Sequence, residues 1–112
     1  MEIINWNDFA KVELRVGTII EIKDFPQARK QAYQVIIDFG QEIGIKKSSA
    51  QITQLYEKEA LVGKQIIGVT NFPPKQIGPF MSDCLITGFI SGEGSVVLAV
   101  PDQKVENGLK LA

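Results

Sequence analysis

Side chains that can hold a polar or anionic ligand gather in two short segments of the sequence, residues 44–52 and 71–77. Both segments combine lysine with hydroxyl or amide side chains, and the second also contains prolines and a phenylalanine. Lysine supplies a point charge and the neutral groups supply hydrogen bonds, so this chemistry is that of binding. The candidate ligand-binding residues in and beside these segments are Lys46, Lys47, Ser48, Gln51, Asn71, Phe72, Lys75, Ile77, Phe80 and Ser82.

Several of these residues also have a purely structural explanation. Ser48 and Gln51 fit a capping box, in which both side chains satisfy free backbone N–H groups at the start of a helix. Lys46 and Lys47 are consecutive, so in a strand only one of them faces a given ligand. Asn71 precedes a proline-rich loop and can simply start the turn. For each residue both explanations stay open.

An apolar cluster surrounds the second segment and consists of Phe72, Ile77, Phe80 and Met81. A small domain has little interior in which to bury so many bulky side chains from one loop, so we expect part of the cluster at the surface. Exposed apolar patches mark interaction sites, and methionine adapts to varied partners. The cluster fits contact with flexible polypeptide and contact with a second copy of the chain about equally well.

The sequence offers no catalytic set. It has no histidine, which is the commonest general base near neutral pH and the commonest transition-metal ligand. Its one cysteine, Cys84, lies in an apolar run and is expected to be an inert, packed thiol. Glu57 and Glu59 alternate with a lysine as on a solvated helix, and residues 92–94 suit a turn. We therefore predict a binding protein and not an enzyme, with no metal and no cofactor.

Length and composition fit a single domain over residues 1–112. The formal net charge of −1 means that overall charge does not hold nucleic acid, so any such site must be a local basic patch. No apolar run approaches the roughly 20 residues that cross a bilayer. One cysteine cannot form an internal disulfide. We expect a cytoplasmic protein without membrane insertion.

The elements that position these residues are mostly strands. Residues 12–23 alternate with period two, and Gly17 marks a bend of the kind that barrel strands make. The row expected to face inward is Val12, Leu14, Val16, Thr18, Ile20 and Ile22.

Further strands and one helical segment follow along the chain. The helical spacing of residues 48–56 predicts a short helix between the third and fourth strands, which residues 57–61 extend and Gly63 ends. Strands without alternating helices exclude a parallel α/β sheet. We predict an all-β fold with short helices, a five-stranded oligonucleotide/oligosaccharide-binding barrel, with an open β-sandwich as the alternative. The further predicted strands cover residues 33–39, 42–47, 64–70, 84–90 and 96–100.

Both ends of the chain carry apolar side chains that a five-stranded barrel does not need. These apolar side chains must be shielded from water, and a twofold interface buries the same patch on each of two copies. We therefore expect N- and C-terminal extensions that form a homodimer interface. Its predicted residues are Ile4, Trp6, Val105, Leu109 and Leu111.

Specific motifs occur along most of the chain, in residues 8–19, 25–29, 37–40, 42–46, 48–53, 71–74, 101–103 and 107–108. In these motifs the sequence resembles the CsaA family of small dimeric chaperones linked to protein export. That family is a branch of the tRNA-binding domain found on methionyl-tRNA synthetases and on the β chain of phenylalanyl-tRNA synthetases. The resemblance implies a barrel of the predicted type, a homodimer built through the chain ends, and affinity for unfolded preproteins and the export ATPase that receives them.

Similarity to the tRNA-binding branch itself is mixed. Residues 61–64 with Asn71, Lys75 and Ser82 match that branch, whereas Gly78 stands where the branch has an arginine. Losing an arginine removes a bidentate phosphate partner that lysine does not replace. The leading hypothesis is a non-enzymatic chaperone for unfolded or export-bound polypeptide, and the alternative is a tRNA-binding module.

Overall fold

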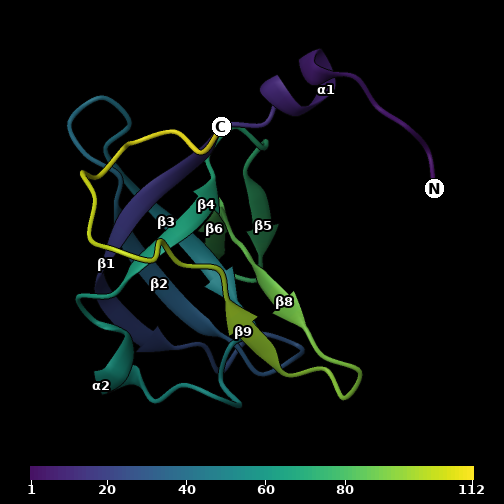
Figure 1. Cartoon of the computed structure of the whole chain (residues 1–112). Coiled ribbons are helices and arrows are strands. Elements are labelled where there is room, and N and C mark those ends of the chain that lie inside the picture. The colour runs from purple at the N-terminus through teal and green to yellow at the C-terminus, as the bar shows by residue number, and fades with distance from the viewer.

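The structure, a computed structural model, describes all residues from Met1 to Ala112. Five antiparallel strands in the order β3-β2-β1-β4-β7 curl into a nearly closed barrel (Figure 1). The predicted barrel of the oligonucleotide/oligosaccharide-binding type is confirmed, and the sandwich alternative is not needed. The strands are β1 (Leu14–Asp24), β2 (Tyr33–Asp38), β3 (Ile45–Ala50), β4 (Gln65–Val69) and β7 (Leu85–Ile86).

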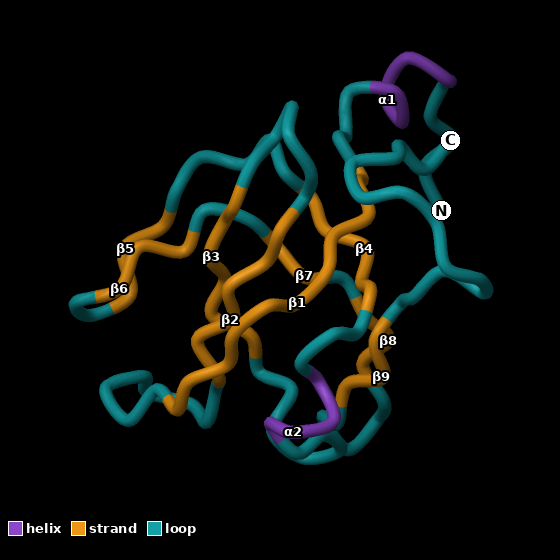
Figure 2. Tube along the Cα trace, turned by 90° about the vertical axis from the view of Figure 1, so that its left-hand side faces the viewer, coloured by secondary structure: helices purple, strands orange, loops and turns teal.

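Two hairpins leave the barrel wall. The first pairs β5 (Lys75–Ile77) with β6 (Phe80–Ser82), and the second pairs β8 (Gly88–Ile90) with β9 (Val96–Leu98). The strand predicted over 84–90 is therefore divided at Thr87 into β7, which belongs to the barrel, and β8, which belongs to a hairpin. Figure 2 shows the two hairpins on different sides of the barrel.

The barrel closes between β3 and the segment that follows β6. The Asp83 N–H donates to the Lys47 carbonyl at 2.9 Å, and the Lys47 N–H donates to Asp83 Oδ1 at 2.7 Å. Two residues further along β3, the Ser49 N–H donates to the side chain of Ser82 at the end of β6, with 3.1 Å to Oγ. Beyond Ser49 this pairing ends, so the barrel wall stays open there.

The core is built around Phe39, which is fully buried. Its ring lies against Gly17 on β1 and Gly68 on β4, where a Cβ atom would come within 2.7 and 2.9 Å of ring carbons. Both glycines therefore make room for one aromatic ring. The other fully buried side chains of the cluster are Ile19, Val35, Ile37, Leu61 and Ile66.

Gly17→Ala is expected to lower the free energy of unfolding by about 1 to 3 kcal/mol, the usual cost of overpacking a core. The added methyl would lie 2.6 Å from Ile37 Cγ2 as well as against Phe39. Urea denaturation measures the change. Gly92→Ala is the matched control, because no atom lies within 4 Å of the added methyl. Equal stability of the two variants would contradict this account of the core.

The predicted inward row of β1 is only partly correct for the first half of the strand, because Val16 is buried as predicted but the barrel core is faced by the other row. Gly17 and Ile19 face the interior, whereas the predicted Ile20 is 44% exposed. The register with β2 shifts between Ile19 and Glu21, which marks a β-bulge. Because one extra residue reverses the alternation, Ile22 beyond the bulge packs against the core as predicted.

The helix predicted over residues 48–56 is also wrong. Strand β3 continues to Ala50, and Ser48 is buried opposite Val35 in the β2–β3 ladder, so it caps nothing. Cross-strand pairing has overridden the local capping pattern. Only α2 (Lys58–Leu61) is helical in this region, and Gly63 after it takes the positive φ of 91° that lets a chain turn away from a helix.

A short helix that the sequence reasoning missed precedes the barrel. In α1 (Trp6–Ala10) the Asp8 N–H donates to Asn5 Oδ1 at 3.0 Å, and the Asn5 N–H donates to Asp8 Oδ2 at 3.2 Å. Asparagine followed three residues later by aspartate was the available signal. The helix buries none of its residues and projects from the barrel in both views (Figures 1 and 2). None of the helices has the length and apolar character needed to cross a membrane.

The C-terminal segment lies along the first half of β1. The Gly108 N–H donates to the Val16 carbonyl at 2.7 Å, and the Val16 N–H donates to the Leu109 carbonyl at 3.1 Å. Arg15 and Lys110 form an isolated antiparallel bridge. The segment thus covers the edge of β1 that β2 leaves unpaired, and its place beside β1 is visible in Figure 1.

Candidate functional site

Three pockets adjoin one another beside the end of β3. Ser49 and Gln51 line all three, and the pockets measure about 690, 400 and 440 Å³. We call the three together the trough, and name them the basic, middle and apolar pockets. Ser49 is half-buried and Gln51 exposed, so the shared floor is accessible.

The basic pocket lies between the loop of residues 25–32 and the β5–β6 hairpin. Arg29, Lys30 and Lys75 line it, no carboxylate does, and the remaining polar lining comes from hydroxyl and amide side chains. The whole chain carries a formal net charge of −1, so these cations are concentrated locally. The three cations attract an anionic group in this pocket, and no carboxylate of the lining repels it.

The two walls of the basic pocket are held together by a small apolar cluster of their own. Phe25 and Phe80 pack with ring centroids 5.3 Å apart, and Ala32 completes the buried part. The Lys47 Nζ lies 5.4 Å from the centroid of the Phe80 ring, within cation–π range. This cluster is separate from the barrel core. Phe80 therefore positions a wall and is itself buried.

The middle pocket joins polar and apolar groups. Phe72 is 51% exposed there, beside Lys75, Ile77 and Ser82. Cys84 also lines it, but burial raises the pKa of its thiol to about 12, so the reactive thiolate is scarce near neutral pH. The predicted inert thiol agrees with this environment.

The apolar pocket occupies the opening in the barrel wall between the end of β3 and the run from β7 to β8. Ile52, Leu85, Ile86, Ile90 and Val96 contribute most of its lining. Phe89 and Val97 form a cross-strand pair on the opposite face of the β8–β9 hairpin, so they lie outside the pocket. A guest in the trough therefore contacts cations at one end and aliphatic groups at the other.

The structure brings together half of the predicted ligand-binding residues and places the others elsewhere. Lys46 and Ser48 lie on the inward row of β3, and Lys47 lies over Phe80. The Asn71 amide is engaged within the chain, accepting from the Glu13 N–H at 3.0 Å and donating to the Lys11 carbonyl at 2.7 Å. The predicted residues that line the trough are Gln51, Phe72, Lys75, Ile77 and Ser82.

Sequence reasoning missed Arg29, Lys30 and Ser49, which line the trough. The adjacent cations in the polar stretch between the first two strands were a usable signal for the first two. Ser49 was missed because residues 48–56 were expected to form a helix, whereas Ser49 lies in strand β3.

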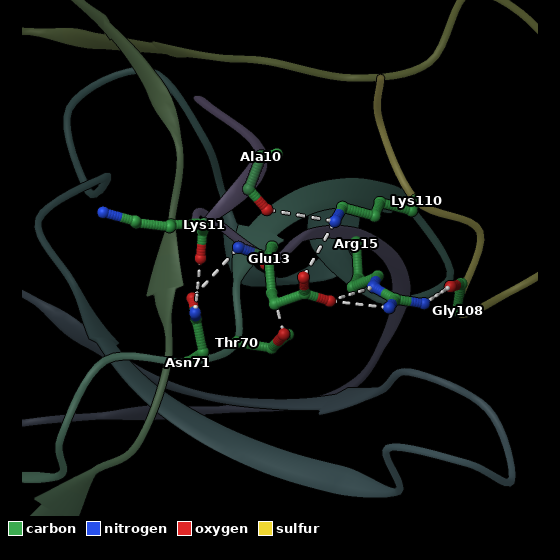
Figure 3. Close-up of polar contacts among 8 residues, drawn as sticks. All are labelled: Ala10, Lys11, Glu13, Arg15, Thr70, Asn71, Gly108 and Lys110. Atoms are coloured by element: carbon green, nitrogen blue, oxygen red, sulfur yellow. Dashed lines mark hydrogen bonds and ion pairs between the residues drawn. The ribbon is translucent and has the colours of Figure 1, made fainter. Parts of the chain in front are cut away.

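A polar network around Glu13 holds the N-terminal segment in place where it joins the barrel (Figure 3). Arg15 donates through Nη2 to Glu13 Oε1 at 2.6 Å, and Lys110 Nζ donates to Glu13 Oε2 at 2.8 Å and to the Ala10 carbonyl at 3.3 Å. These bonds, from Lys110 and then Arg15, lower the pKa of the Glu13 carboxyl. With Asn71 holding the neighbouring backbone, the network joins the C-terminal segment to the base of α1.

Four of the five residues predicted for a dimer interface are exposed in the single chain. Ile4 and Trp6 belong to the projecting N-terminal segment, and Leu109 and Leu111 to the C-terminal segment. Val105 is only partly exposed, and its backbone exchanges two hydrogen bonds with the Gln65 side chain at 2.6 and 3.0 Å.

Comparison with known proteins gives consistent relatives. The family model described as a putative tRNA binding domain matches residues 14–110. Methionine–tRNA ligases of Pyrococcus horikoshii and Bacteroides fragilis are 39% and 34% identical over 111 and 105 residues, but the chain spans only about 15% of their length. Two of the crystal structures that match over nearly all of both chains are CsaA chaperones. The CsaA chaperone protein of Picrophilus torridus is 52% identical with a TM-score of 0.91, covering 98% of this chain and 100% of its own. The chaperone CsaA of Bacillus anthracis is 43% identical with a TM-score of 0.93, covering 99% and 100%.

Proposed function

Because the chain belongs to the putative tRNA-binding domain family, we propose that it acts by binding alone, as a chaperone that holds extended segments of unfolded polypeptide in the trough. The observation that carries this proposal is that the three pockets adjoin at Ser49 and Gln51, which line all of them. A depression of this form, with apolar groups exposed along its length, suits a flexible chain better than a compact small molecule.

The structural relatives support this choice. Two of the proteins that match over nearly the whole length of both chains, at 52% and 43% identity, are described as CsaA chaperones, whereas in the ligases the similar region is a small part of the protein. Export-bound preproteins are the proposed clients, and the export ATPase that receives them is a proposed second partner. The absence of histidine and the high pKa of the Cys84 thiol support a role without catalysis.

Suppression of aggregation tests the proposal. The purified chain, without nucleotide, is expected to reduce light scattering by a chemically unfolded client diluted into buffer, and to bind a panel of fluorescent client peptides. An equal concentration of an unrelated folded protein is the control. A chain that neither reduces scattering nor binds any peptide of the panel would contradict the chaperone role.

A second candidate function, binding of tRNA, is favoured by the charge of the basic pocket. Arg29, Lys30 and Lys75 face one cavity without a carboxylate among its lining residues. Phosphate binding releases counterions, so affinity that depends steeply on salt is its signature. Titration of tRNA at several salt concentrations tests this candidate. A slope of zero in the plot of log affinity against log salt concentration would contradict tRNA binding.

We also propose that the chain works as a homodimer through its terminal segments. Trp6 is 65% exposed on a helix with no buried residue, and Leu109 and Leu111 are exposed on the neighbouring C-terminal segment. The Glu13 network holds these two segments together, so they present one apolar surface that a twofold interface can bury.

Light scattering is expected to give twice the chain mass of 12.4 kDa at micromolar concentration. Trp6→Glu places a charge in the proposed interface and is expected to shift the mass to that of one chain, while Gln41→Glu, which adds the same charge at the exposed turn between β2 and β3, leaves it unchanged. A mass of one chain for the unmodified protein would refute the homodimer.

A further inference from the structure

One side of the run from β7 to β8 is already paired. The Thr87 N–H donates to the Ile67 carbonyl at 3.0 Å, and the Thr87 carbonyl accepts from the Ala99 N–H at 3.2 Å. Further along, the Ser91 N–H donates to the Ser95 carbonyl at 2.8 Å. The odd-numbered residues of this run therefore direct their backbone groups toward β4 and β9.

The even-numbered residues direct theirs to the opposite side. Backbone groups of successive residues in a strand alternate between its two neighbours, so Ile86, Gly88 and Ile90 turn their N–H and C=O groups away from β4 and β9. That side is the apolar pocket, which all three residues line. Gly88 is exposed and Ile90 is 77% exposed, so no other segment of the chain covers this edge.

The opposite wall of the pocket leaves room for another strand. Pairing of β3 with the segment after β6 ends at the Ser49 N–H, and the opening of about 440 Å³ lies between residues 49–52 and the β7–β8 edge. An open edge with free N–H and C=O groups is a template for a further strand. Many edges are protected by charged side chains, yet residues 84–92 contain none.

We propose that the guest polypeptide binds by adding a strand to the β7–β8 edge, with its main chain hydrogen-bonded to Ile86, Gly88 and Ile90. This inference rests on the proposed chaperone function and specifies what it recognises: an extended backbone, with little regard to sequence. Main-chain bonds supply affinity, and alternate side chains of the guest enter the apolar pocket. No charged residue lines the apolar pocket, and the free N–H and C=O groups of the edge recur at every second residue, as those of a partner strand do. Both features favour a polypeptide over a nucleic acid.

Client peptides methylated on alternate backbone nitrogens test the proposal. An unmodified peptide that binds is compared with two versions, one methylated at odd and one at even positions. One version is expected to lose about tenfold or more in affinity because its methyl groups block bonds to the edge, while the other keeps its affinity. Equal effects of the two versions would overturn strand addition and leave the chaperone proposal intact. Absence of binding by the unmodified peptide would instead contradict the chaperone proposal.

A variant of the protein gives an independent measurement. Ile90→Pro removes the edge N–H, which makes no bond to β9, so proline is tolerable at this position. The control Ile90→Ala shortens the side chain and keeps the N–H. Ile90→Pro is expected to bind client about tenfold more weakly than Ile90→Ala. Equal affinities would contradict the proposal.

Amide hydrogen exchange of the unmodified protein tests strand addition even if the Ile90→Pro variant fails to fold. The amides of Ile86, Gly88 and Ile90 are expected to exchange rapidly in the free protein and to become protected when a client peptide is added. Protection before any client is added would indicate that a second copy of the chain occupies the edge. Protection by tRNA in place of peptide would indicate a nucleic acid. Either result would overturn the proposal.

Discussion

Gln51→Trp is expected to weaken binding of unfolded polypeptide by about tenfold to a hundredfold, or ~1.4 to 2.8 kcal/mol. Gln51 lines the basic, middle and apolar pockets, so one large side chain at this position obstructs the trough where all three meet. The residue is exposed and follows the end of β3, so the fold has little reason to change. Fluorescence anisotropy of a labelled client peptide measures the effect.

Gln41→Trp is the matched control for this variant. Gln41 is also exposed, but it lies in the turn between β2 and β3, at the other end of the hairpin from Gln51. The control is expected to bind client as the unmodified protein does, with an unchanged unfolding midpoint for both variants. Equal affinities of the two tryptophan variants would show that the trough is not where polypeptide binds.

Reversing the charge of Arg29, Lys30 and Lys75 together to glutamate is expected to reduce tRNA affinity on the order of a hundredfold at low salt. Each phosphate contact contributes about 0.9 to the slope of log affinity against log salt on duplex nucleic acid, so the slope should fall by nearly three. Titrations of tRNA at several salt concentrations measure both quantities. The three side chains are exposed, so their replacement leaves the cores intact.

The control for net charge reverses Lys11, Lys23 and Lys104, three exposed cations outside the trough. It changes the net charge by the same amount, so it measures the loss that arises from general repulsion of the nucleic acid. A steep slope is expected to persist in this variant. If both triple variants gave the same slope as the unmodified protein, the basic pocket would not be a phosphate site.

The barrel itself could be predicted from the sequence because its strands alternate clearly and glycine falls where the core needs room. Gly17 was placed correctly as a special position in β1, although its role is to admit the Phe39 ring. The bulge at Ile20 could not be found in this way. Ile19 and Ile20 are chemically equivalent, and only the pairing with β2 decides which of them turns inward.

The error at Ser48 has a different physical origin. Serine followed three residues later by glutamine favours a helix start locally, but the ladder with β2 buries Ser48 opposite Val35. Local preferences of about 1 kcal/mol yield to a buried strand pairing of this kind. The same error hid Ser49, whereas Gln51 was named as a candidate ligand-binding residue in spite of it.

Of the three cations that line the basic pocket, only one was predicted from the sequence. Lys75 was identified from its exposed proline-rich loop, but its neighbours Arg29 and Lys30 lie nearly fifty residues earlier in the chain. What brings these segments together is the packing of Phe25 on Phe80, a contact between a loop and the β5–β6 hairpin that periodicity does not reveal. Asn71 shows the converse, since its exposed position suggested a ligand while its amide holds the chain's own backbone.

Amide chemical-shift mapping with an unfolded client tests the central claim most directly. Adding an unfolded polypeptide to the isotopically labelled chain is expected to shift the amides of Ser49, Gln51 and Ile86, which lie along the trough. Saturable binding that shifts only residues of the separate pocket near Lys64 and Asp102, with the trough unaffected, would contradict the account.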